Sequence, residues 1–197
     1  VPQGGRPKDP VPLIRTEDGK PEVAEKWQRW YRVDHQEKGP NGEVMYTERG
    51  RPDRLYRNDG GKFVDVTEEA GIATGPRWGN SGTWWDYNQD GWPDIYTGND
   101  FSDPDYLYRN NGDGTFTEIA QNTVRHTTWF SMGSAQSDLN NDGLIDFIIA
   151  DMMPTTHYMQ KASMASMGSR LKRLLAVPGA RQLMRNALHV NTGTNYF

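Results

Sequence analysis

Two nine-residue loops, DYNQDGWPD at residues 86–94 and DLNNDGLID at residues 138–146, lie 52 residues apart and share one pattern of oxygen-bearing side chains. Asp or Asn at alternate positions can converge on a calcium ion, and the glycine at position six, Gly91 or Gly143, suits a turn that requires positive φ. The spacing therefore predicts one calcium site per loop. The predicted ligands, with Trp92 and Leu144 contributing backbone carbonyls, are Asp86, Asn88, Asp90, Trp92 and Asp94, then Asp138, Asn140, Asp142, Leu144 and Asp146.

Neither loop continues as a helix-flanked calcium hand. The glutamate expected at position twelve is replaced by Thr97 in the first loop and by Ile149 in the second, and strand-like residues follow each loop. The alternative interpretation is a pair of metal-free surface turns rich in Asp, Asn and Gly. Position, glycine and repetition together favour calcium over this alternative.

The repeat extends beyond the loops. LYRNDGGKFVDV at 55–66 returns as LYRNNGDGTFTEI at 107–119, and a third copy begins as LHVNTGTNYF at 188–197. Turns rich in Asn, Asp and Gly between alternating apolar residues predict hairpins. One period therefore contains four strands, expected at 80–85, 94–99, 106–110 and 115–119. Four strands about every 50 residues are typical of a β-propeller blade, so the predicted class is all-β.

The number of blades is small. Residues 51–151 and 187–197 supply just over two blades, whereas closed propellers have about four to eight. We therefore expect the chain to be a propeller fragment whose missing blades belong to a longer chain. The alternative is that partner chains complete the ring.

The ordered motifs resemble a known family. RNDGGKFVDVTEEAGI, DYNQDGWPDIYTGNDF, YLYRNNGDGTFTEI, RHTTWFSMGSAQSDLNNDGLIDFIIADMMP and MRNALHVNTG are similar to the bacterial FG-GAP/VCBS-repeat proteins of the ASPIC/UnbV type. The resemblance covers roughly residues 51–197. It implies a seven-bladed parent propeller, calcium in the blade loops and export to the periplasm, cell surface or medium. The family name implies no reaction.

The material before the repeats differs from them. Residues 1–20 are predicted to form an extended Pro-rich arm, and residues 21–50 a helix over 21–38 followed by a linker, with Pro21 in the first turn. Trp27 and Trp30 fall on one face of this helix. We expect them to dock on the propeller rim or on a partner.

Residues 152–186 interrupt the repeat with a basic insertion. No Asp or Glu occurs from residue 152 to 197, and the six Lys and Arg residues there contrast with a net charge of −10 over residues 1–151. Two short helical pieces are expected, broken at Pro178 and Gly179. Residues 161–185, with Lys172 and Arg173, are expected either to contact an anionic partner or a membrane surface, or to be an elaborated loop packed on the propeller.

Several function classes are excluded or receive no support. The chain has no cysteine, which excludes disulfides and thiol chemistry, and no apolar run long enough to cross a bilayer. The four histidines are scattered, so we predict no catalytic residue, and we expect a structural role for His126 in preference to a metal or catalytic one. No nucleic-acid partner is expected.

Three functions remain open. The first is a non-catalytic, calcium-stabilised binding or scaffold module outside the cytoplasm. The second is an accessory subunit of a larger, membrane-attached assembly, contacting it through the N-terminal arm and the basic insertion. The third is an enzyme acting on a polymer at the propeller mouth, where tryptophans near the first loop would stack on a carbohydrate.

Overall fold

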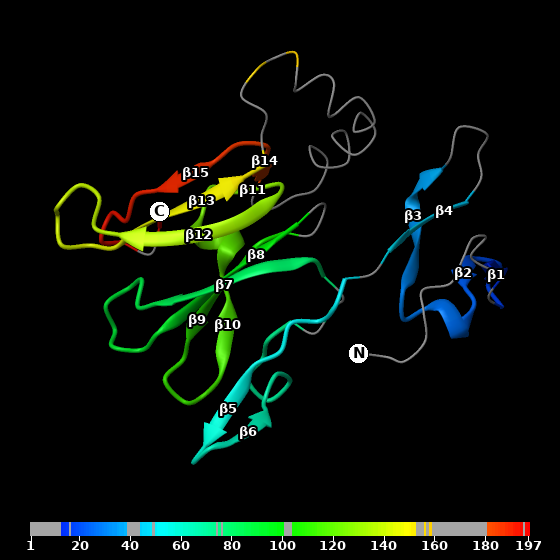
Figure 1. The fold of residues 1–197 in the computed structure, drawn as a ribbon, viewed down its shortest axis with the longest axis horizontal. Coiled ribbons are helices and arrows are strands. Elements are labelled where there is room, and N and C mark those ends of the chain that lie inside the picture. Colours follow the sequence, from blue (N-terminus) through cyan, green and yellow to red (C-terminus); the bar gives the residue numbers. More distant parts are fainter. Residues whose placement is uncertain are drawn as a thin grey trace. The chain divides into compact units, whose positions relative to one another are not determined.

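Strands dominate the protein, as predicted for an all-β chain. The computed structural model describes residues 13–15, 17–38, 44–48, 50–73, 75, 77–100, 104–152, 156, 158, 181–194, 196 and 197 (Figure 1). The helical segments η1 (Glu25–Trp27) and α1 (Ala120–Thr123) are each no longer than about one turn. The chain divides into two compact units, Val1–Gly50 and Arg51–Phe197.

The N-terminal unit consists of two antiparallel pairs of strands. β1 (Leu13–Arg15) pairs with β2 (Pro21–Val23), and β3 (Tyr31–Lys38) pairs with β4 (Val44–Glu48). Val23 and Tyr31 form a small buried core, and the half-buried side chains that pack against it are Trp27, Trp30 and Val33.

The helix predicted over residues 21–38 is therefore wrong. Two strands and η1 replace it, and the Trp27 N–H donates to the Ala24 carbonyl at 2.7 Å while the Trp30 N–H donates to the Trp27 carbonyl at 3.0 Å. This tight turn brings Val23 and Tyr31 into one small core, whereas a helix would have placed them on the same face but about 12 Å apart. Because the same apolar spacing suits both paths, periodicity over so short a segment could not distinguish them.

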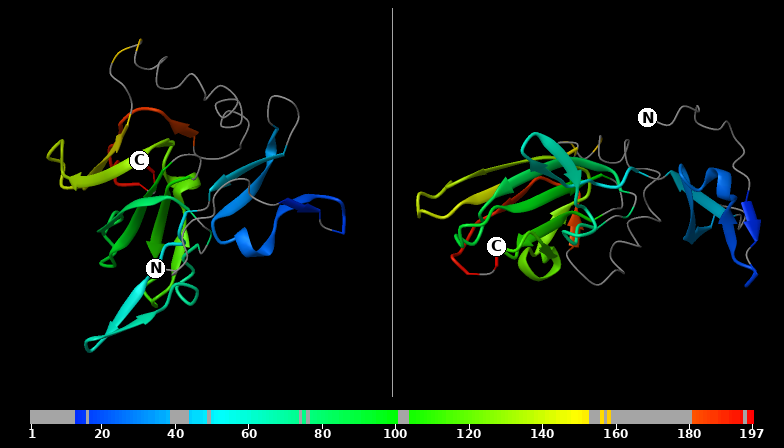
Figure 2. Two further views of the ribbon diagram at one scale, coloured as in Figure 1. Left: turned by 45° about the vertical axis from the view of Figure 1, so that its right-hand side comes forward. Right: turned by 90° about the horizontal axis from the view of Figure 1, so that it is seen from below.

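The C-terminal unit contains three antiparallel sheets (Figures 1 and 2). The first sheet pairs β5 (Tyr56–Asp59) with β6 (Lys62–Asp65). The middle sheet has four strands in the order β10-β9-β8-β7; their bounds are β7 (Gly79–Trp85), β8 (Asp94–Asn99), β9 (Tyr106–Asn110) and β10 (Phe116–Glu118). The last sheet has the order β12-β13-β15; its strands are β12 (Ser131–Ser137), β13 (Asp146–Asp151) and β15 (Ala187–His189). All four strands predicted for one period are confirmed within a residue or two.

The middle and last sheets stack through alternating side chains, and the segment after β6 covers the other face of the middle sheet. Ile95 and Tyr108 lie on the face of the middle sheet that packs on the segment after β6, which contributes Val66, Ala70 and Ile72. We call this the front face. Tyr96 and Leu107 lie on the opposite, rear face of the middle sheet. They pack against the front face of the last sheet, where the buried side chains are Phe147, Ile149 and Ala187.

A short parallel pair completes the unit. β11 (His126–Thr128) lies beside β14 (Arg181–Leu183), with Thr127 opposite Gln182. The second of the two helical pieces predicted for the insertion is thus a strand at residues 181–183. The rest of that prediction, including Lys172 and Arg173, falls outside the described residues.

Candidate functional site

The loop between β7 and β8 is a compact turn built around its own carboxylates. The Asp86 carboxylate accepts the Asp90 N–H on Oδ1 at 3.1 Å and the Gly91 N–H on Oδ2 at 2.8 Å. The Asp90 Oδ1 accepts the Trp92 N–H at 2.9 Å, and its Oδ2 accepts Asn88 Nδ2 at 2.8 Å. These bonds close the loop around the side chains predicted to be ligands.

The loop between β12 and β13 repeats this arrangement bond for bond. The Asp138 carboxylate accepts the N–H groups of Asp142 at 3.1 Å and Gly143 at 2.8 Å, and Asp142 accepts the Leu144 N–H at 2.8 Å. Asn140 Nδ2 donates to Asp142 at 2.8 Å. The shared Asp, Asn and Gly residues are therefore sufficient to specify this loop conformation.

The backbone dihedrals of the two loops agree as well. Gly91 has φ 90° and Gly143 has φ 86°, in the left-handed region that glycine adopts at little cost. The residues at position four, Gln89 and Asn141, have φ values of 58° and 63°. The predicted need for glycine at position six is confirmed. In addition, Gln89 Nε2 donates to the Gly143 carbonyl at 3.0 Å, so the two loops are in contact.

The last aspartate of each loop is buried and connects the loop to a neighbouring strand. Asp94 accepts the Tyr87 N–H at 3.0 Å and the Asn110 N–H at 2.8 Å. Burial raises the pKa of Asp94 to about 6, and the charges of Asp90 and Asp86 add to that effect, while the two backbone hydrogen bonds oppose it. Asp86 and Asp90, at loop positions one and five, therefore repel Asp94 at position nine. This repulsion favours a cation in the loop.

The second loop has the same connection. Asp146 accepts the Leu139 N–H at 3.0 Å and the Asn191 N–H at 2.8 Å. Asn191 Nδ2 also donates to the Tyr87 carbonyl at 2.8 Å, joining the third repeat to the first calcium-type loop. Hydrogen bonds thus connect the two loops to each other and to the middle and last sheets.

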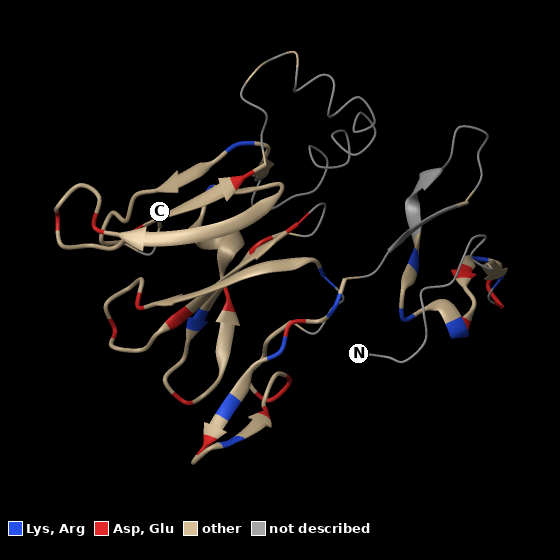
Figure 3. Cartoon of the chain, viewed as in Figure 1, with Lys and Arg blue, Asp and Glu red and all other residues tan. Residues whose placement is uncertain are grey.

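The donor chemistry of the loops fits calcium. Each loop offers only oxygen donors, and a carboxylate oxygen that accepts one N–H keeps a second lone pair. Asp90 and Asp142 are exposed, and Asp86 and Asp138 are half-buried, so an ion can reach them. Figure 3 shows acidic residues, in red, in the loops that join β7 to β8 and β12 to β13. Among the described residues no group of three or more Asp, Glu, His or Cys side chains is arranged as a ready metal site. An ion would therefore have to draw these oxygens closer together.

Asp105 is a buried carboxylate that the sequence analysis missed. It accepts the Tyr96 hydroxyl at 2.5 Å, the Asn99 N–H at 2.7 Å and the Ser131 hydroxyl at 2.6 Å. Burial raises the pKa of Asp105 to about 6, although the hydrogen bonds from Ser131 and Tyr96 lower it. The recurrence of Pro-Asp-x-Leu-Tyr-Arg-Asn at 52–58 and 104–110 could have identified this position.

Two of the four histidines, His126 and His189, form a pair. The rings of His126 and His189 have centroids 5.0 Å apart, and His189 stacks on Phe147 at 4.6 Å. Burial lowers the pKa of His189 to about 4, with a further contribution from His126. Because His189 packs on the core ring of Phe147 and His126 packs on His189, this geometry suits a structural role.

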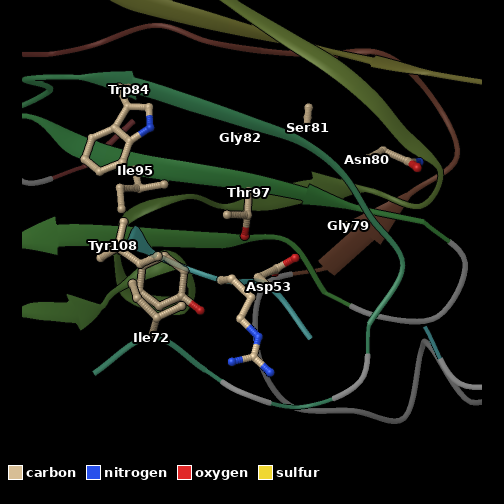
Figure 4. Close-up of a pocket in the computed structure, with 12 residues that line it drawn as sticks. Asp53, Ile72, Gly79, Asn80, Ser81, Gly82, Trp84, Ile95, Thr97 and Tyr108 are labelled. Atoms are coloured by element: carbon tan, nitrogen blue, oxygen red, sulfur yellow. The ribbon is translucent and has the colours of Figure 1, made fainter. Parts of the chain in front are cut away.

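A cavity of about 330 Å³ lies over the front face of the middle sheet (Figure 4). One end is apolar, with Trp84, Ile95 and Tyr108, and the other end is polar, with Asp53 and Asn80. Burial raises the pKa of Asp53, and the charge of Arg77 opposes that shift. Asp53 is the only carboxylate among the described lining residues.

Of the residues predicted to bind a partner, Trp27 and Trp30 lie within the described part of the chain, whereas Lys172 and Arg173 fall outside it. Trp27 and Trp30 are half-buried on the small N-terminal core, with ring centroids 5.8 Å apart. Lys26 lies 5.1 Å from the Trp27 ring centroid, and Arg29 lies 4.4 Å from that of Trp30. These contacts give the two tryptophans a role in holding the N-terminal unit together.

Comparison with known proteins agrees with the repeat. No curated protein matches the chain. None of the described helices has the length and apolar character needed to span a bilayer. The profile of the FG-GAP-like repeat matches residues 42–97 and again residues 86–149, which together make up more than half of the chain. With repeated loops, repeated hairpins and stacked antiparallel sheets, the chain belongs to the FG-GAP-like repeat family.

Proposed function

We propose that the chain is a calcium-stabilised, extracytoplasmic binding or scaffold module of the ASPIC/UnbV type, from a bacterial source. The observation that supports this function best is the equivalence of the two loops. Four of their nine positions differ, yet every described hydrogen bond of one loop core has its counterpart in the other. Two loops that keep the same hydrogen bonds although their sequences differ are well suited to bind the same ligand.

Calcium would act mainly on stability. Three carboxylates in each nine-residue loop repel one another, and a divalent cation removes that repulsion. Because Asp94 and Asp146 are also bonded to the strands that follow, ordering the loops would order the sheet edges. A ligand that binds only the folded chain stabilises it by mass action. In a chain without cysteine, this cation would do what disulfides do in other exported proteins.

The same chemistry supports an extracytoplasmic location. Calcium sites of extracellular modules have dissociation constants of about 10⁻⁴–10⁻³ M, which suits a compartment rich in calcium. The two loops lack the bidentate glutamate of tight sites, so we expect affinities in this weak range. Attachment to a larger membrane-bound assembly through residues 161–185 remains the second hypothesis. No described contact favours the third, an enzyme acting on a polymer.

A calcium titration tests the proposal. The full chain should melt at a higher temperature in saturating calcium than in excess chelator. Its free energy of unfolding should rise by about 2.7 kcal/mol per site when calcium is at 100 times the dissociation constant. Asp90→Ala and Asp142→Ala should each remove one of two sites counted by calorimetry, and the double variant should remove both.

Asp113→Ala is the matched control. Asp113 also accepts a backbone N–H in a turn, from Thr115 at 2.9 Å, but it lies outside both loops. This variant should keep the full response to calcium. If the parent chain melts at one temperature in calcium and in chelator, and calorimetry detects no binding, the proposed function is wrong.

A further inference from the structure

The cavity over the front face of the middle sheet contains hydrogen-bonding groups that the protein does not itself satisfy. Thr97 and Asn99 follow Ile95 at alternate positions of β8, so all three side chains lie on this face. The Thr97 hydroxyl and the Asn99 Oδ1 atom are buried and have no hydrogen-bond partner. Because buried polar groups nearly always have a partner, these two atoms indicate a ligand that supplies one.

The free oxygen of Asn99 lies beside the carboxylate of Asp53. Asn99 is 0% exposed, and its Nδ2 donates to the Pro104 carbonyl at 2.7 Å, which leaves Oδ1 as the free atom. A Cβ built on Gly79, which lines the cavity, would stand 2.6 Å from Asp53 Oδ1 and 3.7 Å from Asn99 Oδ1. Two hydrogen-bond acceptors therefore flank one glycine at the polar end of the cavity.

Strand register sets the order of the groups from the apolar end to the polar end (Figure 4). Three pairs of residues face each other across β7 and β8; in that order they are Trp84 and Ile95, Gly82 and Thr97, and Gly79 and Asn99. A Cβ added at Gly82 would meet nothing within 4 Å, so the floor of the cavity is open at its centre. A ligand lying there would contact an aromatic ring at one end and hydrogen-bond acceptors at the other.

The charges around the cavity are already balanced. Asp53 is the one carboxylate among the described lining residues, and the charge of Arg77 acts on it. Arg54, which also lines the cavity, is paired with Asp65. The atoms that remain without a partner, a hydroxyl and an amide oxygen, are uncharged. A neutral ligand that donates several hydrogen bonds therefore fits this cavity better than an ion does.

We infer that this cavity binds a single neutral hexose unit, an inference that rests on the proposed binding function and names its ligand class. A pyranose ring has a rim of hydroxyl donors for Asp53, Thr97 and Asn99, and an apolar face of C–H groups for the Trp84 ring. Trp84 is 52% exposed, and its edge-on contact with Phe116, with ring centroids 6.2 Å apart, fixes the orientation of the indole. A volume of about 330 Å³ is at the lower end of the range of about 300–1,000 Å³ for small-molecule sites, which suits one sugar ring.

The test is saturation-transfer NMR on the full chain in calcium, with the methyl glycosides of glucose, galactose and mannose as probes. We expect saturable binding of at least one of them. Trp84→Ala removes the stacking ring and should weaken that binding by about ten-fold or more. Gly82→Val fills the open floor with a residue that strands favour, and should weaken it as much. The control is Gly133→Val in β12, where a Cβ also meets nothing within 4 Å, and binding should be unchanged.

Thr97→Val separates binding from stability. Valine has nearly the shape of threonine and lacks the hydroxyl, which has no partner in the folded chain. The melting temperature without sugar should therefore stay the same or rise, whereas sugar binding should weaken by about five-fold or more. A hydroxyl with a merely structural role would give the opposite result, a lower melting temperature and unchanged binding, and that result would overturn the inference.

The other contrary outcomes are as definite. A folded chain that responds to calcium but binds none of the three glycosides would overturn this inference and leave the calcium proposal standing. Equal binding by the parent chain, Gly82→Val and Thr97→Val would place the sugar elsewhere and overturn it as well. Sugar binding with the expected losses in a chain that melts at one temperature in calcium and in chelator would support the inference, while the calcium proposal would be wrong.

Discussion

The Asp105 carboxylate accepts a hydrogen bond of 2.6 Å from the Ser131 hydroxyl, and so connects the residue before β9 to the first residue of β12. Both side chains are buried, at 2% and 0% exposure. The bond therefore joins the middle sheet to the last sheet at one end of their interface. By the 52-residue repeat, Asp53 stands at the corresponding position, where it faces Gly79 in place of a serine.

Asp105→Ala should destabilise the chain by about 3–5 kcal/mol. The substitution leaves the Tyr96 hydroxyl, the Ser131 hydroxyl and the Asn99 N–H without their acceptor in a buried place. Denaturant unfolding measures the loss. Asp113→Ala, in an exposed turn, is the comparison and should change stability much less. Equal effects of the two substitutions would show that the buried network contributes little.

Asp105→Asn should change how stability depends on pH. The folded pKa of about 6 lies above the ordinary value of 3.8, so the stability associated with the neutral carboxyl is fully present below pH 3.8 and is lost as pH rises through 6. The free energy of unfolding therefore falls by about 3 kcal/mol between the two ends of this pH range. An amide does not titrate, so the stability of Asp105→Asn relative to the parent should rise between pH 4 and pH 6. A constant difference across this range would contradict the prediction.

His189→Phe should show the opposite trend. The folded pKa of about 4 lies below the ordinary value of 6.5, so the stability associated with the neutral imidazole is present above pH 6.5 and is lost as pH falls through 4. The parent should lose about 3 kcal/mol by this route, and the phenylalanine variant should not. Phenylalanine keeps the stacking on Phe147 and removes a ring nitrogen, Nε2, that is buried without a hydrogen-bond partner. Parallel pH curves for the two proteins would sink this explanation.

Asn191→Ala should cost more stability than Asn110→Ala, although the two asparagines occupy equivalent positions in the repeat. Asn191 is buried and donates to the carbonyls of Tyr87 at 2.8 Å and Ile145 at 3.3 Å, whereas the side chain of Asn110 donates to the Pro93 carbonyl at an exposed site. We expect roughly 2–3 kcal/mol for Asn191 and roughly 1 kcal/mol for Asn110. Thermal unfolding of both variants decides the order.

Gly91→Ala and Gly143→Ala should each cost about 1–2 kcal/mol, because both residues hold φ near +90°. Gly133→Ala in β12 is the control: its φ is not positive and a Cβ there would meet nothing within 4 Å. That substitution should be neutral or slightly stabilising. Similar losses at all three positions would mean that the loop conformation is not the cause.

The sequence was sufficient for the elements that depend on local chemistry. The two loops, the strands near them and the hairpins were predictable because the Asp, Asn and Gly residues satisfy backbone N–H groups within a few residues of themselves. The segment at 21–38 was not, because the same spacing of apolar residues suits one face of a helix and also the observed turn between strands. The spacing of apolar residues over so short a segment does not distinguish a helix from a turn between strands.

What the sequence by itself determined, then, is the repeat: its period, its strands and the conformation of its two carboxylate loops. Only the tertiary structure decided which faces of those strands are buried and which polar groups join the sheets. Asp105 meets Ser131 across 26 residues and Asn191 meets Tyr87 across 104, and no local pattern specifies such partners. The physical reason is that a buried carboxylate or amide is stable only where distant donors and acceptors converge on it, and sheet stacking brings them together.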